Sequence, residues 1–111
     1  AEGDEVTNPL DDIILERRRQ EAKWGQQDLP DGDGTTEKLY LHAEAEKARC
    51  DKAHDERRCT FAHVLREEVA EALAECAPDN DPERRARLRR ELIEVAAVCV
   101  KWVESLDRRT V

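Results

Sequence analysis

The chain has 111 residues, of which 39% are apolar, 41% charged and only 4% aromatic, and its formal net charge is −8. This length suits one modest hydrophobic core, and the lack of β-branched and aromatic runs excludes a β-sandwich or β-barrel. The negative charge excludes a general binder of nucleic acid or of anionic membrane, since both need a basic surface. No apolar run reaches about 18 residues, so no transmembrane helix is expected, and residues 1–8 lack the pattern of a signal peptide. These features predict a cytoplasmic protein built from amphipathic helices.

The N-terminal part predicts a short lead-in followed by a helix. Residues 1–8 are expected to be a flexible lead-in that ends in a helix cap. Asn8 is a typical capping residue, Pro9 suits the first helical turn, and the two aspartates that follow suit the positive end of the helix dipole. The helix is expected to continue to about Trp24 and to end at Gly25.

A loop and a second helix are expected next. Residues 26–36 are rich in glycine and aspartate and contain a proline, which is typical of a loop. Thr35 or Thr36 is a suitable cap for a helix over about 37–55. The apolar positions of this helix form only a weak, alanine-rich stripe.

Two further helices carry the clearest periodicity in the chain. Thr60 is a suitable cap for a helix over about 61–76, in which apolar residues recur every three or four positions and which Pro78 ends. The string DPE at 81–83 indicates a new helix start, and the helix is expected to run over 82–107. The basic residues at its beginning are expected to be solvated. The chain is therefore predicted to be all-α, with four helices.

Four glutamates on the last two helices are candidate metal ligands. Glu68 and Glu71 are three residues apart, as are Glu91 and Glu94, so each pair lies on one face of its helix. Two antiparallel helices joined by a short turn can bring these faces together, and four converging carboxylates repel one another unless a cation is bound. Mg²⁺ prefers oxygen ligands and keeps positions for waters or phosphates. We therefore expect a Mg²⁺ site here, with Mn²⁺ as an alternative ion.

The prediction of a metal site depends mainly on Glu94. Taken alone, Glu67, Glu68 and Glu71 are typical of the solvated face of an acidic helix. Residues 92–100, however, are apolar everywhere except at Glu94, so this segment is expected to be buried on all sides. A buried carboxylate needs a partner, either a metal ion or an arginine from another helix. The matching glutamates nearby favour the metal.

The two glutamate pairs lie in strings that resemble those of a known family. The strings EVAEALAE at 68–75 and ELIEVAAV at 91–98 resemble the ExxE…ExxD signature of the MazG-like all-α nucleoside triphosphate pyrophosphohydrolases. The string ERRRQEAKWGQQDLPDG at 16–32 resembles the N-terminal stretch of the small bacterial and phage members, so that the resemblance covers about residues 10–109. The last ligand of the family is usually Asp, and here Glu94 keeps the charge and adds a methylene.

The resemblance implies a fold and an activity. The fold would be a four-helix MazG-like bundle, a single domain over residues 9–109, with its core completed in a homodimer or homotetramer. The activity would be Mg²⁺-dependent hydrolysis of a nucleoside triphosphate to the monophosphate and pyrophosphate by an activated water. Glu67 is a candidate acceptor of the proton of that water. Lys101, which lies two helical turns beyond Glu94, is a candidate contact for a phosphate.

Further contacts to a nucleotide are expected at the end of the first helix. Trp24 could stack on a nucleobase, and Lys23 and Arg19 could meet phosphates beside a flexible glycine-rich loop able to close over a ligand. Core packing of Trp24 and a solvated position of the basic residues are the alternatives. A hypothesis of a different class is a non-catalytic acidic helical protein that binds a protein partner or senses nucleotides.

Cys50, His54, Cys59 and His63 form a second constellation. Cys and His four residues apart share a helix face, and two such pairs could bind Zn²⁺. The spacing matches no usual zinc pattern, and the turn between the second and third helices is expected in its middle. We therefore favour an ordinary surface or core position for these side chains.

Overall fold

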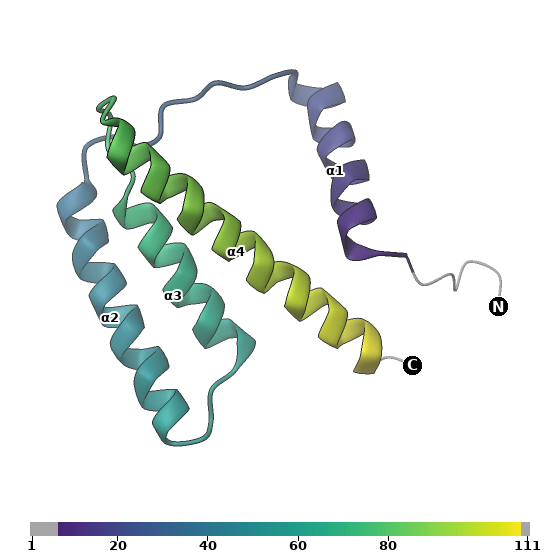
Figure 1. Cartoon of the computed structure of the whole chain (residues 1–111), viewed down its shortest axis with the longest axis vertical. Coiled ribbons are helices and arrows are strands. Elements are labelled where there is room, and N and C mark those ends of the chain that lie inside the picture. Colours follow the sequence, from purple (N-terminus) through teal and green to yellow (C-terminus); the bar gives the residue numbers. More distant parts are fainter. Residues whose placement is uncertain (1–6, 110–111) are drawn as a thin grey trace. The chain divides into compact units, whose positions relative to one another are not determined.

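The computed structural model describes residues 7–109, with the side chains at 36 and 37 excepted. Within this range the chain forms four α-helices and no strand, namely α1 (Pro9–Trp24), α2 (Thr36–Asp55), α3 (Phe61–Ala74) and α4 (Pro82–Arg109), as Figure 1 shows. The prediction of an all-α fold is confirmed for this part of the chain. Most of the lead-in predicted over residues 1–8 lies outside the described residues.

The chain divides into two compact units. One unit is Pro30–Cys99, which holds α2, α3 and the first part of α4. The other consists of the described residues up to Leu29, including α1, together with the last part of α4 from Val100. The single domain expected over residues 9–109 stays a prediction.

The helix ends follow their capping residues. The side chain of Asn8 accepts a hydrogen bond from the backbone N–H of Leu10 at 2.9 Å, and α1 ends at Gly25 with a φ of 69°, as predicted. The hydroxyl of Thr60 accepts from the backbone N–H of His63, and Nδ1 of His63 accepts from the backbone N–H of Thr60 at 3.1 Å. This reciprocal pair is a capping box that fixes the start of α3.

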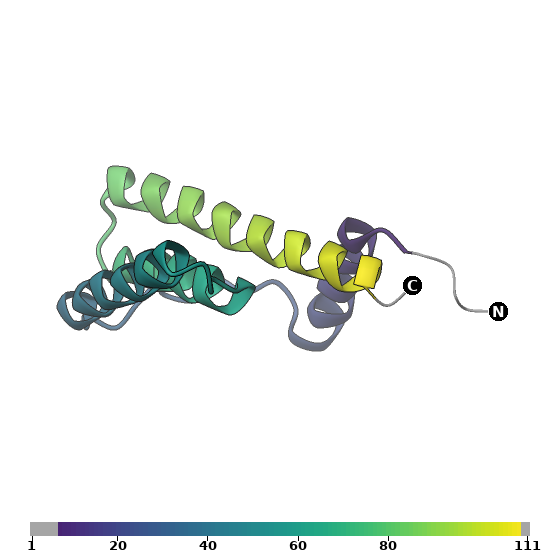
Figure 2. The same ribbon diagram turned by 90° about the horizontal axis from the view of Figure 1, so that it is seen from below.

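The core of the unit Pro30–Cys99 is thin and built mainly from small side chains. α2 and α3 lie side by side, and the first part of α4 lies across them (Figures 1 and 2). Ala72, Cys76 and Leu88 form a buried cluster against which Val95 packs, and this cluster joins α3 to α4. The remaining buried apolar residues are alanine and cysteine, namely Ala43, Cys50, Ala53 and Ala70.

The prediction that residues 92–100 are buried on all sides is wrong for the single chain. Leu92 and Ile93 are 53% and 57% exposed, and Glu94 is exposed as well. The physical reason is that, within its own unit, α4 has α2 and α3 on one side only, so the opposite side of the helix meets solvent. Completion of the core in a homo-oligomer stays a prediction.

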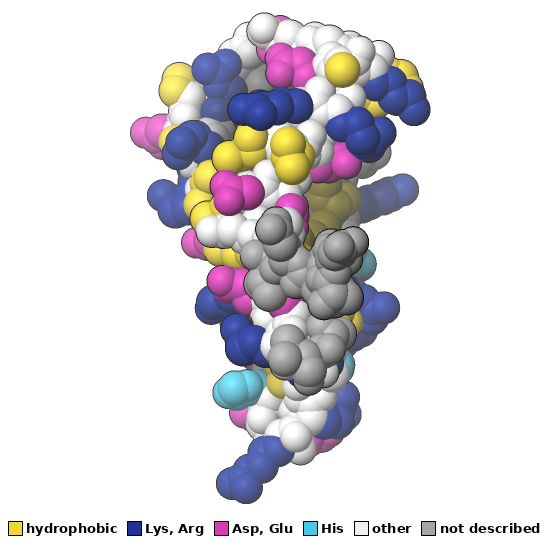
Figure 3. Space-filling model, turned by 90° about the vertical axis from the view of Figure 1, so that its right-hand side faces the viewer, with side chains coloured by type: hydrophobic (Ala, Val, Ile, Leu, Met, Phe, Trp, Pro, Cys, Tyr) yellow, Lys and Arg dark blue, Asp and Glu magenta, His cyan; other side chains and the backbone are white. Residues whose placement is uncertain are grey.

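The molecular surface is mixed in charge where it can be seen. On the face drawn in Figure 3, lysine and arginine side chains alternate with aspartate and glutamate and with apolar patches. None of the helices in the described range is both long and apolar enough to cross a lipid bilayer.

Candidate metal centre

The four glutamates predicted as ligands come together between α3 and α4. One carboxylate oxygen from each of Glu68, Glu71, Glu91 and Glu94 lies within 4.8 Å of those of the other three. In the part of the chain that the structure describes, no other three or more His, Cys, Asp or Glu side chains are gathered in this way. The three-residue spacing within each pair and the return of the chain between α3 and α4 produce this arrangement, as expected from the sequence.

The closeness of the carboxylates changes their acidity. Partial burial, and next the repulsion of Glu68 and Glu91, raise the pKa of Glu71 from its ordinary value of 4.5 to about 7. Burial and then the neighbouring Glu94 raise the pKa of Glu68 and of Glu91 as well. These shifts show that the cluster resists carrying its full negative charge at neutral pH.

Two oxygens of the cluster lack a protein partner. Oε2 of Glu68 and Oε2 of Glu91 are buried, and neither accepts a hydrogen bond within the described residues. An unsatisfied buried oxygen is costly, and a bound cation removes the cost. Carboxylate oxygens are the ligands that Mg²⁺ and Mn²⁺ prefer, so the donor set fits these ions. Glu94 is exposed, so one side of the cluster is open to solvent.

Arg84 fixes the turn that brings the two glutamate pairs into register. Its Nε donates to Oδ1 of Asp79 at 2.8 Å, its Nη2 donates to the backbone oxygen of Asp79 at 2.9 Å, and its Nη1 donates to the backbone oxygen of Glu75. Its Nη2 also lies 3.6 Å from the carboxylate of Asp31, in the loop before α2. Glu75 follows the last residue of α3 and Arg84 lies in the first turn of α4. The expectation that the basic start of α4 is solvated is therefore wrong for Arg84, which is 5% exposed.

The loop before α2 is anchored to the same turn. Gly32 packs so closely on Cys76 that a Cβ at position 32 would lie 2.7 Å from the backbone oxygen of Cys76. Asp31, the preceding residue, pairs with Arg84. This part of the loop is thus attached to the α3–α4 turn through both its backbone and its charge, and the expectation that the loop closes over a ligand stays a prediction.

Glu67 is half-buried on α3 and faces a different neighbour. After burial, the largest causes that raise the pKa of the Cys50 thiol to about 12 are a hydrogen bond from this thiol to Glu67 and the charge of Glu67. Glu67 also acts on its own helix, since its charge contributes to the raised pKa of Glu71. Its role as a proton acceptor stays a prediction.

The remaining predicted contacts lie in the other unit. Trp24 is 60% exposed, so it is not a core residue of the single chain, and Nζ of Lys23 lies 4.8 Å from the centre of its ring. Arg19 is exposed, and its Nε donates to Glu16 at 2.8 Å. Lys101 is exposed on α4. The proposed contacts of these four residues with a nucleotide stay predictions.

The candidate zinc ligands do not form a common site. Within the described residues, Cys50, His54, Cys59 and His63 are not gathered into one group of ligand atoms. Nδ1 of His63 is instead used in the cap of α3. Burial and the neighbouring acid hold the pKa of Cys50 at about 12, which disfavours the thiolate form that binds metal.

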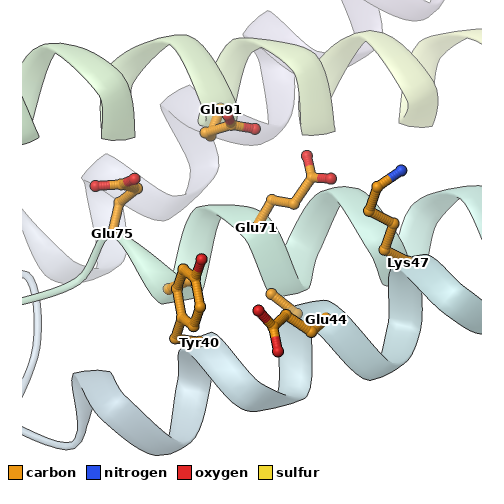
Figure 4. Close-up of a pocket in the computed structure, with 8 residues that line it drawn as sticks. Tyr40, Glu44, Lys47, Glu71, Glu75 and Glu91 are labelled. Atoms are coloured by element: carbon orange, nitrogen blue, oxygen red, sulfur yellow. The ribbon is translucent and has the colours of Figure 1, made fainter.

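A groove beside the carboxylates was not predicted from the sequence. It has a volume of about 200 Å³ and lies between α2, α3 and α4, all within the unit Pro30–Cys99 (Figure 4). Glu71 and Glu91 belong both to this groove and to the glutamate cluster. The other lining residues are Tyr40, Ala43, Glu44 and Lys47 from α2 and Ala74 and Glu75 from the end of α3. The sequence signal was present, because the four residues from α2 recur at helical spacing.

Comparisons with family models, with curated proteins and with solved structures found no match to this chain. The MazG-like resemblance therefore stays a prediction that rests on the strings at 68–75, 91–98 and 16–32.

Proposed function

We propose that the chain is a Mg²⁺-dependent nucleoside triphosphate pyrophosphohydrolase. The observation that supports this most is the convergence of four glutamates, with one oxygen from each inside a span of 4.8 Å. The pKa of Glu71 is raised, and two buried carboxylate oxygens lack a partner within the described residues. A bound divalent cation would reduce the repulsion and give these oxygens a partner. The resemblance of the same two glutamate pairs to the MazG-like signature supplies the expected substrate, a phosphoric anhydride.

The chain's own residues would have distinct tasks in this reaction. Glu68, Glu71, Glu91 and Glu94 would hold the cation by carboxylate oxygens. When bound, Mg²⁺ would offset the negative charge of the phosphate oxygens and make a nearby water more acidic. In the proposed reaction a water would attack the α-phosphorus and break its bond to the bridging oxygen, and the products would be a nucleoside monophosphate and pyrophosphate. Glu67 remains the candidate acceptor for the proton that the water loses.

Product analysis with purified protein tests the proposal. Each common ribo- and deoxyribonucleoside triphosphate is incubated with Mg²⁺ or Mn²⁺, and pyrophosphate and monophosphate are quantified separately. Glu71→Gln and Glu91→Gln should each lower kcat/KM by about 100-fold or more, since they remove charge from the ion's ligands. Glu104→Gln, an exposed acid near the end of α4, is the matched control. Absence of pyrophosphate with every nucleotide and both ions would contradict the proposal.

A second candidate is a non-catalytic acidic protein that binds a protein partner or senses nucleotides. The specific observation in its favour is the exposed pair Leu92 and Ile93, which lies beside the exposed Glu94. Such a protein would bind a partner without turning over nucleotides, and its melting temperature would not respond to Mg²⁺. The enzyme hypothesis requires turnover of a nucleotide and a melting temperature that rises with Mg²⁺. The proposed pyrophosphohydrolase is also expected to be cytoplasmic and to form a homodimer or homotetramer.

A further inference from the structure

The groove beside the glutamate cluster has two walls of different character. α2 contributes Tyr40, Ala43, Glu44 and Lys47, which fall on one helix face because they follow one another at intervals of three or four residues. Figure 4 shows that the side chains of Tyr40 and Lys47 extend from α2 toward α4, with Glu44 beside the tyrosine ring. The chain thus places an aromatic ring at one end of the groove and an ammonium group at the other.

The opposite wall is formed by acids of α3 and α4. Glu71 and Glu91 lie between the tyrosine and lysine ends in Figure 4, and Glu75 lies above Tyr40. Ala74, which lines the same groove, has too small a side chain to fill the space between the two walls. The residues that would hold a metal ion are therefore part of the groove, and a ligand in the groove would touch the ion.

The dimensions suit part of a nucleotide. A volume of about 200 Å³ is below the roughly 300–1,000 Å³ of sites that enclose a whole small molecule. The groove would thus enclose one part of a nucleotide and leave the rest over the open side of the carboxylates. Tyr40 and Lys47 are two turns apart, which is about 10 Å along the helix axis. This spacing is comparable with the distance from the base to the phosphates in an extended nucleotide.

The tyrosine end is suited to a flat, apolar ring. Tyr40 is 59% exposed in the single chain, so its ring is free to stack on a ligand. Base–aromatic stacking tolerates any base, because every base has a π-face. Selectivity must therefore come from the polar groups around the ring.

Glu44 and Glu75 are the acidic residues that line the groove near Tyr40 (Figure 4). Glu75 is paired with Arg87, at 3.2 Å between Oε2 and Nε, whereas Glu44 is exposed and lies beside the tyrosine ring (Figure 4). An ionised carboxylate only accepts hydrogen bonds. It therefore attracts the exocyclic amino group of cytosine, adenine or guanine and repels the carbonyl oxygen that uracil and thymine carry in its place.

The lysine end is suited to phosphate. Nζ of Lys47 lies 3.3 Å from Asp51, but both side chains are about 60% exposed, and such surface pairs exchange at little cost. Asp51 first, and then Glu67 and Glu71, raise the pKa of Lys47, so its ammonium group stays charged. A phosphate held by the cation at Glu71 would find this positive charge beside it.

We propose that this groove binds the nucleotide substrate, with Tyr40 stacked on the base, Glu44 accepting a hydrogen bond from an exocyclic amino group and Lys47 beside the phosphates. The inference rests on the proposed pyrophosphohydrolase activity and goes beyond it by naming the base class. Amino-bearing bases are preferred over uracil and thymine. dCTP and dUTP are the sharpest pair of probes, because their bases differ only in the group at position 4 and in the proton that uracil carries on the adjacent N3.

The experiment measures kcat/KM for dCTP and dUTP with Mg²⁺ in the full chain and in matched variants. The unaltered chain should prefer dCTP by about tenfold, the effect of one hydrogen bond to a charged group in a partly open site. Glu44→Gln should bring the ratio close to one while activity on dUTP persists, because an amide can also donate to a carbonyl oxygen. Glu56→Gln, just beyond the end of α2 and outside the groove, should leave the ratio unchanged.

Two further variants test the ends of the groove. Tyr40→Ala should raise KM about tenfold or more for both nucleotides, whereas Tyr40→Phe should retain stacking and nearly normal KM. Leu41→Ala, at the adjacent exposed residue outside the groove, is the control. Lys47→Met should raise KM by about tenfold, with the exposed Lys52→Met as its control.

The outcomes separate the groove from the activity. Pyrophosphate release with an unchanged dCTP preference in Glu44→Gln and an unchanged KM in Tyr40→Ala would overturn the inference and leave the proposed function intact. No hydrolysis of any nucleotide by the unaltered chain would overturn the proposed function. In that case calorimetric titration of dCTP and dUTP in Ca²⁺ decides the groove separately, and equal or absent binding of the two would overturn this inference too.

Discussion

Arg84 and Asp79 are joined by two hydrogen bonds, from Nε to the carboxylate at 2.8 Å and from Nη2 to the backbone oxygen at 2.9 Å. This fork spans the turn between α3 and α4. Because Glu71 lies one turn before the end of α3 and Glu91 two turns after Arg84, the fork controls how the two glutamate pairs face each other. The geometry of the candidate metal centre therefore depends on a side chain outside it.

Replacement of Arg84 by methionine should weaken both the fold and the metal site. The change removes the donors to Asp79 and to the backbone oxygen of Glu75 and leaves these acceptors without their partner. We expect the melting temperature to fall by roughly 5 °C or more. The affinity for Mg²⁺ should fall as well, measured by calorimetry below the melting range. Arg85→Met, at the exposed neighbour, should change neither.

Replacement of Gly32 by alanine should destabilise the chain through overpacking. The new Cβ would meet the backbone oxygen of Cys76 at 2.7 Å, and a backbone atom cannot turn aside as a side chain can. We expect a loss of about 1–3 kcal/mol in the free energy of unfolding, measured by urea denaturation. If Gly32→Ala were as stable as the unaltered chain, the close packing of this loop on the end of α3 would be contradicted.

Mg²⁺ should stabilise the chain, and the effect should require the glutamate cluster. At a Mg²⁺ concentration 100 times its Kd, linkage gives about 2.7 kcal/mol, which corresponds to a rise of roughly 10 °C in melting temperature. Glu91→Gln should abolish most of this rise. The same variant should melt at a higher temperature than the unaltered chain when metal is absent, because it removes a repelling charge. A substitution that stabilises the chain and abolishes turnover would mark a functional residue.

The stability of the metal-free chain should fall as the pH rises toward neutrality. Folding raises the pKa of Glu71 from 4.5 to about 7, so between these values the folded chain keeps a proton that the unfolded chain releases. The free energy of unfolding therefore decreases through this window and is constant above it. The raised pKa values of Glu68 and Glu91 act in the same direction. The charge of Glu67 adds to the repulsion at Glu71, and the nearby ammonium of Lys47 opposes it.

Thermal melting in EDTA at about pH 5 and about pH 7.5 checks whether the stability falls as the pH rises. We expect the lower melting temperature at the higher pH, and a smaller difference in Glu71→Gln. Saturating Mg²⁺ should remove the difference as well, because the bound ion takes the place of the proton. A melting temperature that rises between these two pH values without metal would contradict the raised pKa values.

The helices and the glutamate cluster could be predicted because local signals decide them. Asn8, Gly25 and Thr60 mark helix ends by their own hydrogen-bonding and conformational preferences, and the structure has caps at all three. The spacing within each glutamate pair fixes a common face by helix geometry alone. The prediction needed only one long-range assumption, that α3 and α4 return on each other across a short turn.

The burial of individual residues could not be predicted in the same way. Glu94 was expected in a buried segment because its neighbours are apolar, but burial depends on which helices cover α4, and periodicity does not contain this information. Arg84 was expected to be solvated as part of a basic run, yet the turn acceptors bury it. Tyr40 and Lys47 were overlooked, since their importance comes from α3 and α4 lying opposite them.

The position of Arg84 has a consequence for how the chain opens. One guanidinium group bonds the end of α3 and the α3–α4 turn and pairs with the loop before α2, so none of these segments can detach without breaking contacts that hold the others. Segments that share their bonds in this way exchange their amide hydrogens as one cooperative block. In native-state hydrogen exchange, the amides of the loop around Gly32 should therefore be protected almost as well as those of the helix ends beside it. The amides of a loop this rich in glycine ordinarily exchange rapidly.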